Sequence, residues 1–329
     1  MTIPSSLSRG LRLPVIASPL FIISNPDLVL AQCKAGVIGS FPALNARPAT
    51  LLDEWLQRIT EELGDHARRH PEAPPAAFAV NQIVHKSNSR LEHDLELCVK
   101  YKVPLVITSL GARVEVNDAV HSYGGIVMHD VIDQRFAHKA IEKGADGLIL
   151  VAAGAGGHAG SQSPFALMQE TREWFDGPIA LSGAISRGAS ILAAQVLGAD
   201  FAYVGSAFIA TNEANADLRY KQAIVAGDAG GIVYTNLFTG VHGNYLRSSI
   251  VAAGLDPERL PQSDPSAMNF GSIADGSTPV KAWRDIWGAG QGVGAVHRIQ
   301  PAAELIAQLE SEYRRALSNL PVSAAFAGH

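Results

Sequence analysis

Short apolar segments alternate with amphipathic segments along most of residues 11–212, and this alternation constrains the fold more than any other feature of the chain. Strands that alternate with helices at this spacing form parallel βαβ units. A count of eight strands favours a closed (β/α)8 barrel, the TIM barrel, over an open doubly wound sheet. The eight expected strands are residues 11–17, 36–39, 76–80, 104–108, 125–129, 148–153, 179–182 and 201–205.

The segments between these strands have apolar residues at helical spacing. The polar, proline-containing residues 66–75 predict a surface connection. Helices are expected at residues 26–34, 51–63, 90–100, 114–122, 134–143 and 188–197.

The pattern changes after residue 212, which predicts a second, smaller unit. Residues 213–280 contain two expected helices followed by loops rich in Gly, Pro, Ser and Asp. We interpret residues 1–212 as the barrel and residues 213–280 as an inserted, mainly helical cap domain over its mouth. Residues 281–329 would form a return loop and a final amphipathic helix that packs on the barrel.

Composition excludes several classes of protein. A net charge of −5 without a basic face argues against nucleic acid and anionic membranes as partners. No uncharged apolar run approaches the roughly 20 residues that span a bilayer, and residues 1–12 do not resemble a signal peptide. The two cysteines, Cys33 and Cys98, fit a reducing compartment, and no metal-ligand spacing is present. We expect a soluble, cytoplasmic protein; a homodimer is compatible with the sequence and is not determined by it.

Candidate site residues follow the expected strands, because active sites of such barrels lie at the carboxyl ends of the strands. After the sixth strand, a loop with Gly154, Gly156, Gly157 and Gly160 surrounds His158. Glycine permits close backbone approach and positive φ. Taken alone, this loop fits a ligand site and a flexible, solvated loop equally well.

The loops after the last two strands are the most informative. Ser182, Gly183 and Ala184 follow the seventh strand, and Gly205 and Ser206 follow the eighth. Backbone N–H groups and hydroxyls at these positions can hold a phosphate. The alternative is that small residues only form tight turns, and we favour phosphate binding.

Each of three further features allows two interpretations. Asn81 either hydrogen-bonds the edge of a heterocycle or caps the next segment. Asp130 either belongs to the site or caps the helix that begins near Gln134. The loop 288–294, with a glycine at every second position, either contacts a ligand or is a flexible linker, and it does not match a dinucleotide-binding fingerprint.

Six segments together resemble the nitronate monooxygenase family, formerly 2-nitropropane dioxygenase, which includes related NADH:quinone reductases. The resemblance covers most of the barrel in order and is weakest over residues 213–280. The segments are LPVIASPL (13–20), AVN (79–81), AGGHAG (155–160), LSGAI (181–185), GADFAYVGSAFIAT (198–211) and GAGQG (288–292).

This resemblance implies an FMN-binding barrel with the flavin at its mouth. The resemblance makes His158 the active-site histidine. The residues that it implies for the cofactor are Pro19, Leu20, Phe21 and Asn81 beside the ring, Gly156 and Gly157 against it, Ser182, Gly183, Ala184, Gly205 and Ser206 at the phosphate, and Gln291 and Gly292 in the C-terminal loop.

Three residues at this site depart from the family pattern. Leu20 occupies a position where the family often has methionine, and Asp130 stands where the quinone-reductase branch has a lysine near the flavin. Ile83 also replaces a hydroxyl residue after Gln82. A carboxylate cannot stabilise a reduced flavin anion as lysine would.

The expected activity is oxidation of an alkyl nitronate by O2 to a carbonyl compound and nitrite. His158 would act as a base on a neutral nitroalkane or, as a cation, hold the nitro oxygens of a nitronate. One alternative is an NAD(P)H-dependent FMN reductase acting on quinones or enoyl substrates. The other is a flavin-free phosphate-binding barrel without a redox role.

Overall fold

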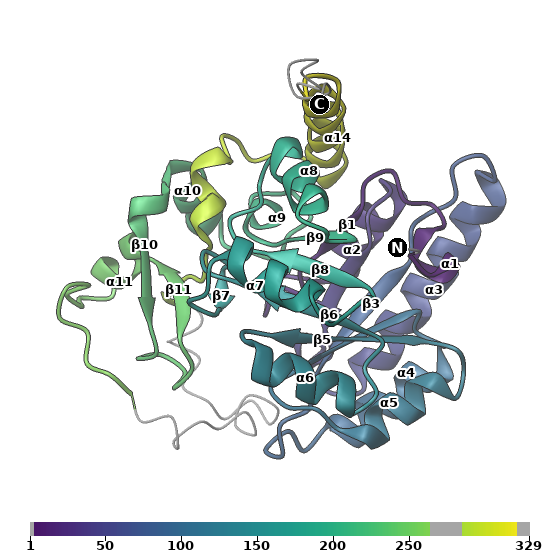
Figure 1. Cartoon of the computed structure of the whole chain (residues 1–329). Coiled ribbons are helices and arrows are strands. Elements are labelled where there is room, and N and C mark those ends of the chain that lie inside the picture. Colours follow the sequence, from purple (N-terminus) through teal and green to yellow (C-terminus); the bar gives the residue numbers. More distant parts are fainter. Residues whose placement is uncertain (1–2, 264–284, 321–329) are drawn as a thin grey trace, which may run out of the picture.

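The computed structural model describes residues 3–263 and 285–320, and within these ranges eight parallel strands form a closed barrel (Figure 1). The hydrogen-bonded order is β1-β9-β8-β6-β5-β4-β3-β2, and a parallel bridge between Ile16 and Ile38 joins its two ends. The TIM barrel predicted from the sequence is therefore confirmed. The strands are β1 (Val15–Ala17), β2 (Gly39–Pro42), β3 (Phe78–Ile83), β4 (Leu105–Ser109), β5 (Ile126–Val131), β6 (Gly147–Val151), β8 (Ile179–Ser182) and β9 (Phe201–Val204).

Helices surround the barrel, and α2 and α6 begin at side-chain caps. Asn25 accepts from the Leu28 N–H at the start of α2, and Asp133 accepts from the Phe136 N–H at the start of α6. The helices are α1 (Ser5–Ser8), α2 (Pro26–Lys34), η1 (Ala43–Asn45), α3 (Leu51–Arg69), α4 (Leu91–Lys100), α5 (Val114–His121), α6 (Gln134–Glu142), α7 (Pro164–Arg172), α8 (Gly188–Val196) and α9 (Ser206–Ile209).

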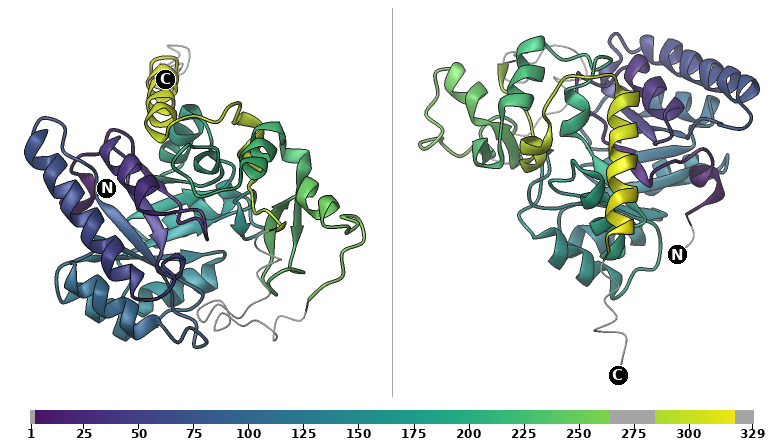
Figure 2. Two further views of the ribbon diagram at one scale, coloured as in Figure 1. Left: turned by 180° about the vertical axis from the view of Figure 1, so that it is seen from behind. Right: turned by 90° about the horizontal axis from the view of Figure 1, so that it is seen from above.

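The final helix, α14 (Ala302–Ser318), lies beside α8, as expected of a C-terminal helix that packs on the barrel (Figures 1 and 2). Glycine at position 188 permits this approach, since a Cβ there would lie 2.1 Å from the backbone nitrogen of Tyr313. Glu312 accepts from the Gly188 N–H at 2.9 Å and from Arg187 Nη1 at 2.7 Å. The helix thereby ties the C-terminal part of the chain to the barrel wall.

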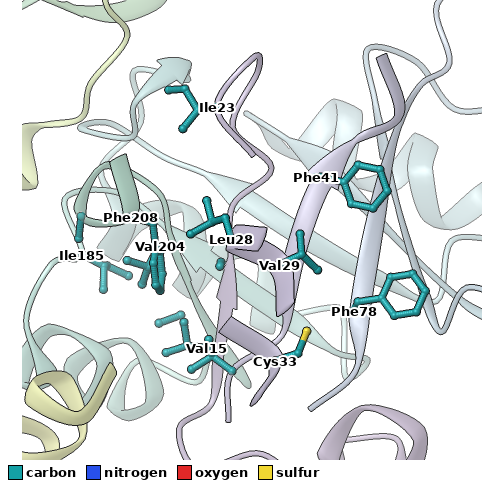
Figure 3. Packing of buried hydrophobic residues seen from close by; sticks show 14 of the residues in the cluster. Val15, Ile23, Leu28, Val29, Cys33, Phe41, Phe78, Ile185, Val204 and Phe208 are labelled. Carbon is teal, nitrogen blue, oxygen red and sulfur yellow. The ribbon is translucent and has the colours of Figure 1, made fainter. Parts of the chain in front are cut away.

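Alternation along each strand divides the core into two layers. Leu105 and Ile107 of β4 belong to the cluster inside the barrel, whereas Val106 between them packs against the surrounding helices. Figure 3 shows part of this outer layer, including Val15 of β1 and Leu28, Val29 and Cys33 of α2. Because the barrel interior is filled by side chains, ligands have access only at its ends.

Several element bounds differ from those predicted. The second strand is Gly39–Pro42 instead of residues 36–39, because its register is set by pairing with β3. Helix α3 continues to Arg69, so residues 66–69 belong to a helix and not to a surface connection. Its buried face holds Leu52, Leu56, Ile59 and Leu63, and its last turn contains the basic residues His66, Arg68 and Arg69.

The segment after residue 212 contains a β-hairpin beside its helices, which the prediction of a mainly helical cap missed. The hairpin also pairs with the two-residue strand β7 (Gly157–His158) from the glycine-rich loop, and the sheet lies to one side of the barrel (Figures 1 and 2). Residues 264–280 of the predicted cap lie outside the described residues. The elements are α10 (Leu218–Ala226), η2 (Ala229–Gly231), β10 (Ile232–Thr235), β11 (Gly243–Leu246), α11 (Arg247–Ala252) and, in the return loop, η4 (Gln291–Ala295).

Candidate active site

A cavity of about 730 Å³ opens at the carboxyl ends of the barrel strands and is bordered by the hairpin segment. This volume is typical of a pocket for a small molecule or cofactor. Gln291 is not part of the lining; its backbone N–H donates to the Gly154 carbonyl at 2.9 Å. The other residues predicted for the site all line the cavity: Pro19, Leu20, Phe21, Asn81, Gly156, Gly157, His158, Ser182, Gly183, Ala184, Gly205, Ser206 and Gly292.

His158 is positioned by β7, which pairs antiparallel with β11 through Gly243. Its Nε2 lies 2.9 Å from Thr239 Oγ1, and that hydroxyl lies 3.0 Å from the Val241 carbonyl oxygen. The carbonyl can only accept, so the Thr239 hydroxyl donates to it and accepts from His158 Nε2–H. Burial lowers the pKa of His158 to about 4. The imidazole is therefore neutral near pH 7, and Nδ1 is the nitrogen that can take a proton.

The glycine-rich loop is held in place by neighbouring backbone. A Cβ on Gly156 would lie 2.7 Å from the nitrogen of Gly290, so the loop and the C-terminal return loop touch through their main chains. Gly157 has φ +67°, and a Cβ there would meet nothing within 4 Å. The backbone at Gly157 is thus open to the cavity, which allows a flat ligand to approach it closely.

The two loops predicted to bind phosphate follow the neighbouring strands β8 and β9, and both line the cavity. Gly183 adopts φ +140°, and a Cβ there would lie 2.8 Å from the Ala153 carbonyl oxygen, so this turn requires glycine. Ser206 Oγ accepts from the Gly290 N–H at 2.8 Å, which leaves its hydroxyl hydrogen available to a ligand. A Cβ on Gly292 would lie 2.4 Å from Ser186 Oγ. Ser182, Gly183, Ala184, Gly205 and Ser206 thus form a cradle of small residues at the cavity, held in place by these close contacts.

Three side chains on adjacent strands form a hydrogen-bonded row at the cavity. Asn81 Nδ2 donates to the Ile107 carbonyl at 3.2 Å and to Ser109 Oγ at 2.7 Å. Ser109 Oγ donates to Asp130 Oδ2 at 2.5 Å. Because the Ile107 carbonyl can only accept, the amide nitrogen must face it, and Asn81 Oδ1 is left to accept from a ligand N–H.

Asp130 therefore belongs to the cavity and does not cap the following helix. The cap of α6 is Asp133, whose carboxylate accepts from the Phe136 N–H at 2.9 Å. Burial raises the pKa of Asp130 to about 6, against the lowering effect of the hydrogen bond from Ser109. The interpretation of Asp130 as a helix cap was wrong because the strand runs one residue beyond it, to Val131.

An apolar cluster forms part of the cavity wall. Leu110 and Ile22 both line it with positive φ, +64° and +59°, an unfavourable conformation for branched side chains. Backbone strain of this kind persists where the surrounding structure fixes it, and it is concentrated at functional sites. The apolar wall consists of Leu44, Phe21, Ile83, Leu110 and Val241.

Charged groups are scarce around the cavity. Among the described residues, its lining includes Asp130 and four histidines but no Lys or Arg. The described part of the chain holds no cluster of three or more His, Cys, Asp or Glu side chains that could bind a metal ion. It also contains no helix that is long and apolar enough to cross a membrane.

The fold and the cavity define a TIM-barrel protein whose ligand site lies at the carboxyl ends of the strands, where the active sites of such barrels occur. The model of the nitronate monooxygenase family matches residues 7–312. The chain belongs to this family. It is therefore an FMN-dependent oxidoreductase, which sets aside the flavin-free alternative.

Individual relatives agree with this assignment. The chain is 26% identical to a nitronate monooxygenase of Paraburkholderia phytofirmans, over 94% of this chain and 95% of the relative. It is also 26% identical to a nitronate monooxygenase of Pseudomonas aeruginosa, over 93% and 97% of the two chains.

Solved structures share the fold. The nitroalkane oxidase of Streptomyces ansochromogenes superimposes with a TM-score of 0.78 at 22% identity, over 96% of this chain and 100% of that chain. FabK from Thermotoga maritima gives 0.76 at 21% identity, over 97% and 99%.

Proposed function

We propose that the protein is a nitronate monooxygenase that oxidises alkyl nitronates with O2 to a carbonyl compound and nitrite, with FMN held in the 730 Å³ cavity. The observation that carries the proposal is that the cradle of small residues, the open backbone at Gly157 and the His158 imidazole all line this cavity. When bound, FMN supplies the electron transfer between nitronate and O2.

The chain fits FMN residue by residue. The phosphate would be held by Ser182, Gly183, Ala184, Gly205 and Ser206, because their loops follow neighbouring strands and line the cavity. Pro19, Leu20 and Phe21 would contact the ring from one side, and Gly156 and Gly157 from the other. Asn81 Oδ1 would accept from an N–H at the ring edge. Gly292, which lines the cavity, and the preceding residue Gln291 would border the cofactor from the return loop.

His158 would accept a proton from a neutral nitroalkane. Its lowered pKa of about 4 keeps it neutral at working pH, which favours the role of base over that of a permanent cation. The nitronate anion that forms beside it would raise the pKa of the imidazole and so stabilise the transferred proton. Thr239 would orient the ring through Nε2.

The apolar wall would receive the alkyl group of the substrate. Phe21, Leu44, Ile83, Leu110 and Val241 offer no charged group to this part of the ligand. Burial of alkyl surface here would contribute to binding in proportion to the area covered. We therefore propose a small alkyl nitronate as the substrate class.

An NAD(P)H-dependent reduction of quinones or enoyl substrates is the second candidate. It is less well supported, because the described lining provides no Lys or Arg for the phosphates of a dinucleotide. We further propose a cytoplasmic location, since Cys33 and Cys98 are both unpaired. Whether the enzyme forms a homodimer is a separate question for solution measurements.

Aerobic turnover tests the proposal. FMN-loaded protein supplied with an alkyl nitronate and O2, without a reduced nicotinamide, should consume O2 and release nitrite and the corresponding aldehyde or ketone. Formation of neither product, together with rapid quinone-dependent oxidation of NADH, would overturn it in favour of the reductase.

A further inference from the structure

Asp130 is a carboxyl group at the wall of a cofactor cavity, and its hydrogen bonds have a fixed direction. Asn81 donates to Ser109, and Ser109 donates to Asp130 Oδ2 at 2.5 Å. The three residues stand on β3, β4 and β5 and all line the cavity. Since Oδ2 receives the serine hydrogen, Oδ1 is the oxygen on which a proton can reside.

The titratable groups nearest to Asp130 are neutral. Tyr203 of β9 is a buried phenol whose pKa is raised by burial and by Asp130 itself. His129, the preceding residue on β5, contacts Thr108 Oγ1 through Nδ1 at 2.6 Å, and burial lowers its pKa to about 4. On the neighbouring strand β6, the residue in register with Asp130 is Ile149.

The remaining titratable groups of the cavity come from its loops. His158 on β7 is neutral near pH 7, as described above. His85, after β3, lies 2.8 Å from Ser87 Oγ through Nδ1, and His242, before β11, stacks on Tyr234. The described lining thus provides no permanent cation that could balance a negative charge in the cavity.

We propose that Asp130 takes up a proton when the bound FMN is reduced. The inference rests on the proposed FMN site. Two electrons and one proton convert FMN into a reduced anion, and a second proton from solvent adds to the Asp130 carboxylate. The electrons come from the nitronate or, in the experiment, from a chemical reductant. Two negative charges in one poorly solvated cavity disfavour each other, and the proton removes one of them.

The test is the midpoint potential of the FMN-loaded protein as a function of pH. Above about pH 6, where Asp130 begins to ionise, the wild type should take up one proton more per two electrons than Asp130→Asn. One proton corresponds to a tenfold change in the equilibrium constant per pH unit, or about 30 mV for a two-electron couple. Asparagine keeps the size of the side chain and an acceptor for Ser109.

Two further variants make the test specific. Ser109→Ala removes the hydrogen bond that lowers the pKa of Asp130. The pH above which the midpoint potential falls more steeply than in Asp130→Asn should therefore be higher in this variant. Asp133→Asn removes a carboxylate that caps α6 outside the cavity lining. The midpoint potential of this variant should have the same pH dependence as that of the wild type.

Infrared difference spectra provide a direct second readout. The reduced-minus-oxidised spectrum of the wild type should contain a protonated-carboxyl band that Asp130→Asn lacks. Parallel potential–pH lines for wild type and Asp130→Asn, without such a band, would overturn the inference and leave the FMN site intact. Failure of the protein to bind FMN in the cavity would instead refute the proposed function.

Discussion

The contact between Thr239 and His158 gives the sharpest prediction about the active site. Thr239→Val keeps the shape of the side chain but removes the hydroxyl that accepts from His158 Nε2–H at 2.9 Å. A net hydrogen bond contributes about 0.5–1.5 kcal/mol. If this energy orients the base in the transition state, kcat/KM for a neutral nitroalkane should fall about 2- to 12-fold.

The choice of substrate isolates this effect. A pre-formed nitronate needs no base, so its kcat/KM in Thr239→Val should remain close to that of the wild type. Thr239→Ser should restore the activity on the nitroalkane. Thr235→Val, in the same hairpin segment but outside the cavity lining, serves as the matched control. Equal losses on both substrates, or no loss on either with FMN content unchanged, would refute the assignment of Thr239 and His158.

Further predictions concern cofactor retention, pH and packing. Gly205→Val should lower the FMN content of purified protein by crowding the phosphate, whereas Gly205→Ala should retain it because its Cβ would meet the nearest atoms at 3.4 Å. Burial lowers the pKa of His129 from 6.5 to about 4, so the unfolded chain binds this proton first on acidification. Between pH 6.5 and 4 this difference should cost up to about 3 kcal/mol of unfolding free energy, measured by urea denaturation against His129→Asn. Gly188→Ala should lower the unfolding free energy by about 1–3 kcal/mol, because its Cβ would lie 2.1 Å from the Tyr313 nitrogen. Gly64→Ala, in the interior of α3 with 3.6 Å to its nearest atom, should raise it by about 0.5–1 kcal/mol.

A clear contrary result exists for the predictions on Gly205, His129 and Gly188. Unchanged FMN content in Gly205→Val would remove Gly205 from the phosphate site. Identical pH dependence of stability in wild type and His129→Asn would show that the imidazole is not held neutral by the fold. Equal stability of Gly188→Ala and wild type would mean that α8 and α14 do not rely on the close approach at Gly188.

The barrel could be predicted because each of its elements is indicated by a short, continuous stretch of sequence. Each strand is a short apolar run, each following helix has apolar residues at helical spacing, and some helices have a cap, such as Asn25 before α2. The carboxyl ends of the strands then follow from the topology, which is why the predicted site residues meet in one cavity. Identification of the family added the cofactor, which no local pattern specifies.

The hairpin and its contact with the site could not be predicted in the same way. Strand β7 has only two residues, and its partner β11 is distant in sequence, so their pairing leaves no periodic signal. Thr239 lies in the loop between β10 and β11 and has no motif around it. The run Ile232–Thr235 has the β-branched and aromatic composition of a strand and was the one signal that could have located the hairpin.

Asp130 shows a different limit. The sequence placed it near the start of a helix, where an aspartate commonly acts as a cap, and the structure assigns the cap to Asp133. Asp130 lies three residues before the cap and lines the cavity instead. Only the register of β4 with β5 brings Ser109 and Asp130 together.

Anaerobic mixing of the FMN-loaded protein with an alkyl nitronate tests the central claim most directly. The absorbance of the flavin is followed after mixing, and a parallel experiment replaces the nitronate by NADH. We predict that the nitronate alone bleaches the flavin and that NADH does so slowly or not at all. Rapid bleaching by NADH, with no response to the nitronate, would contradict the account.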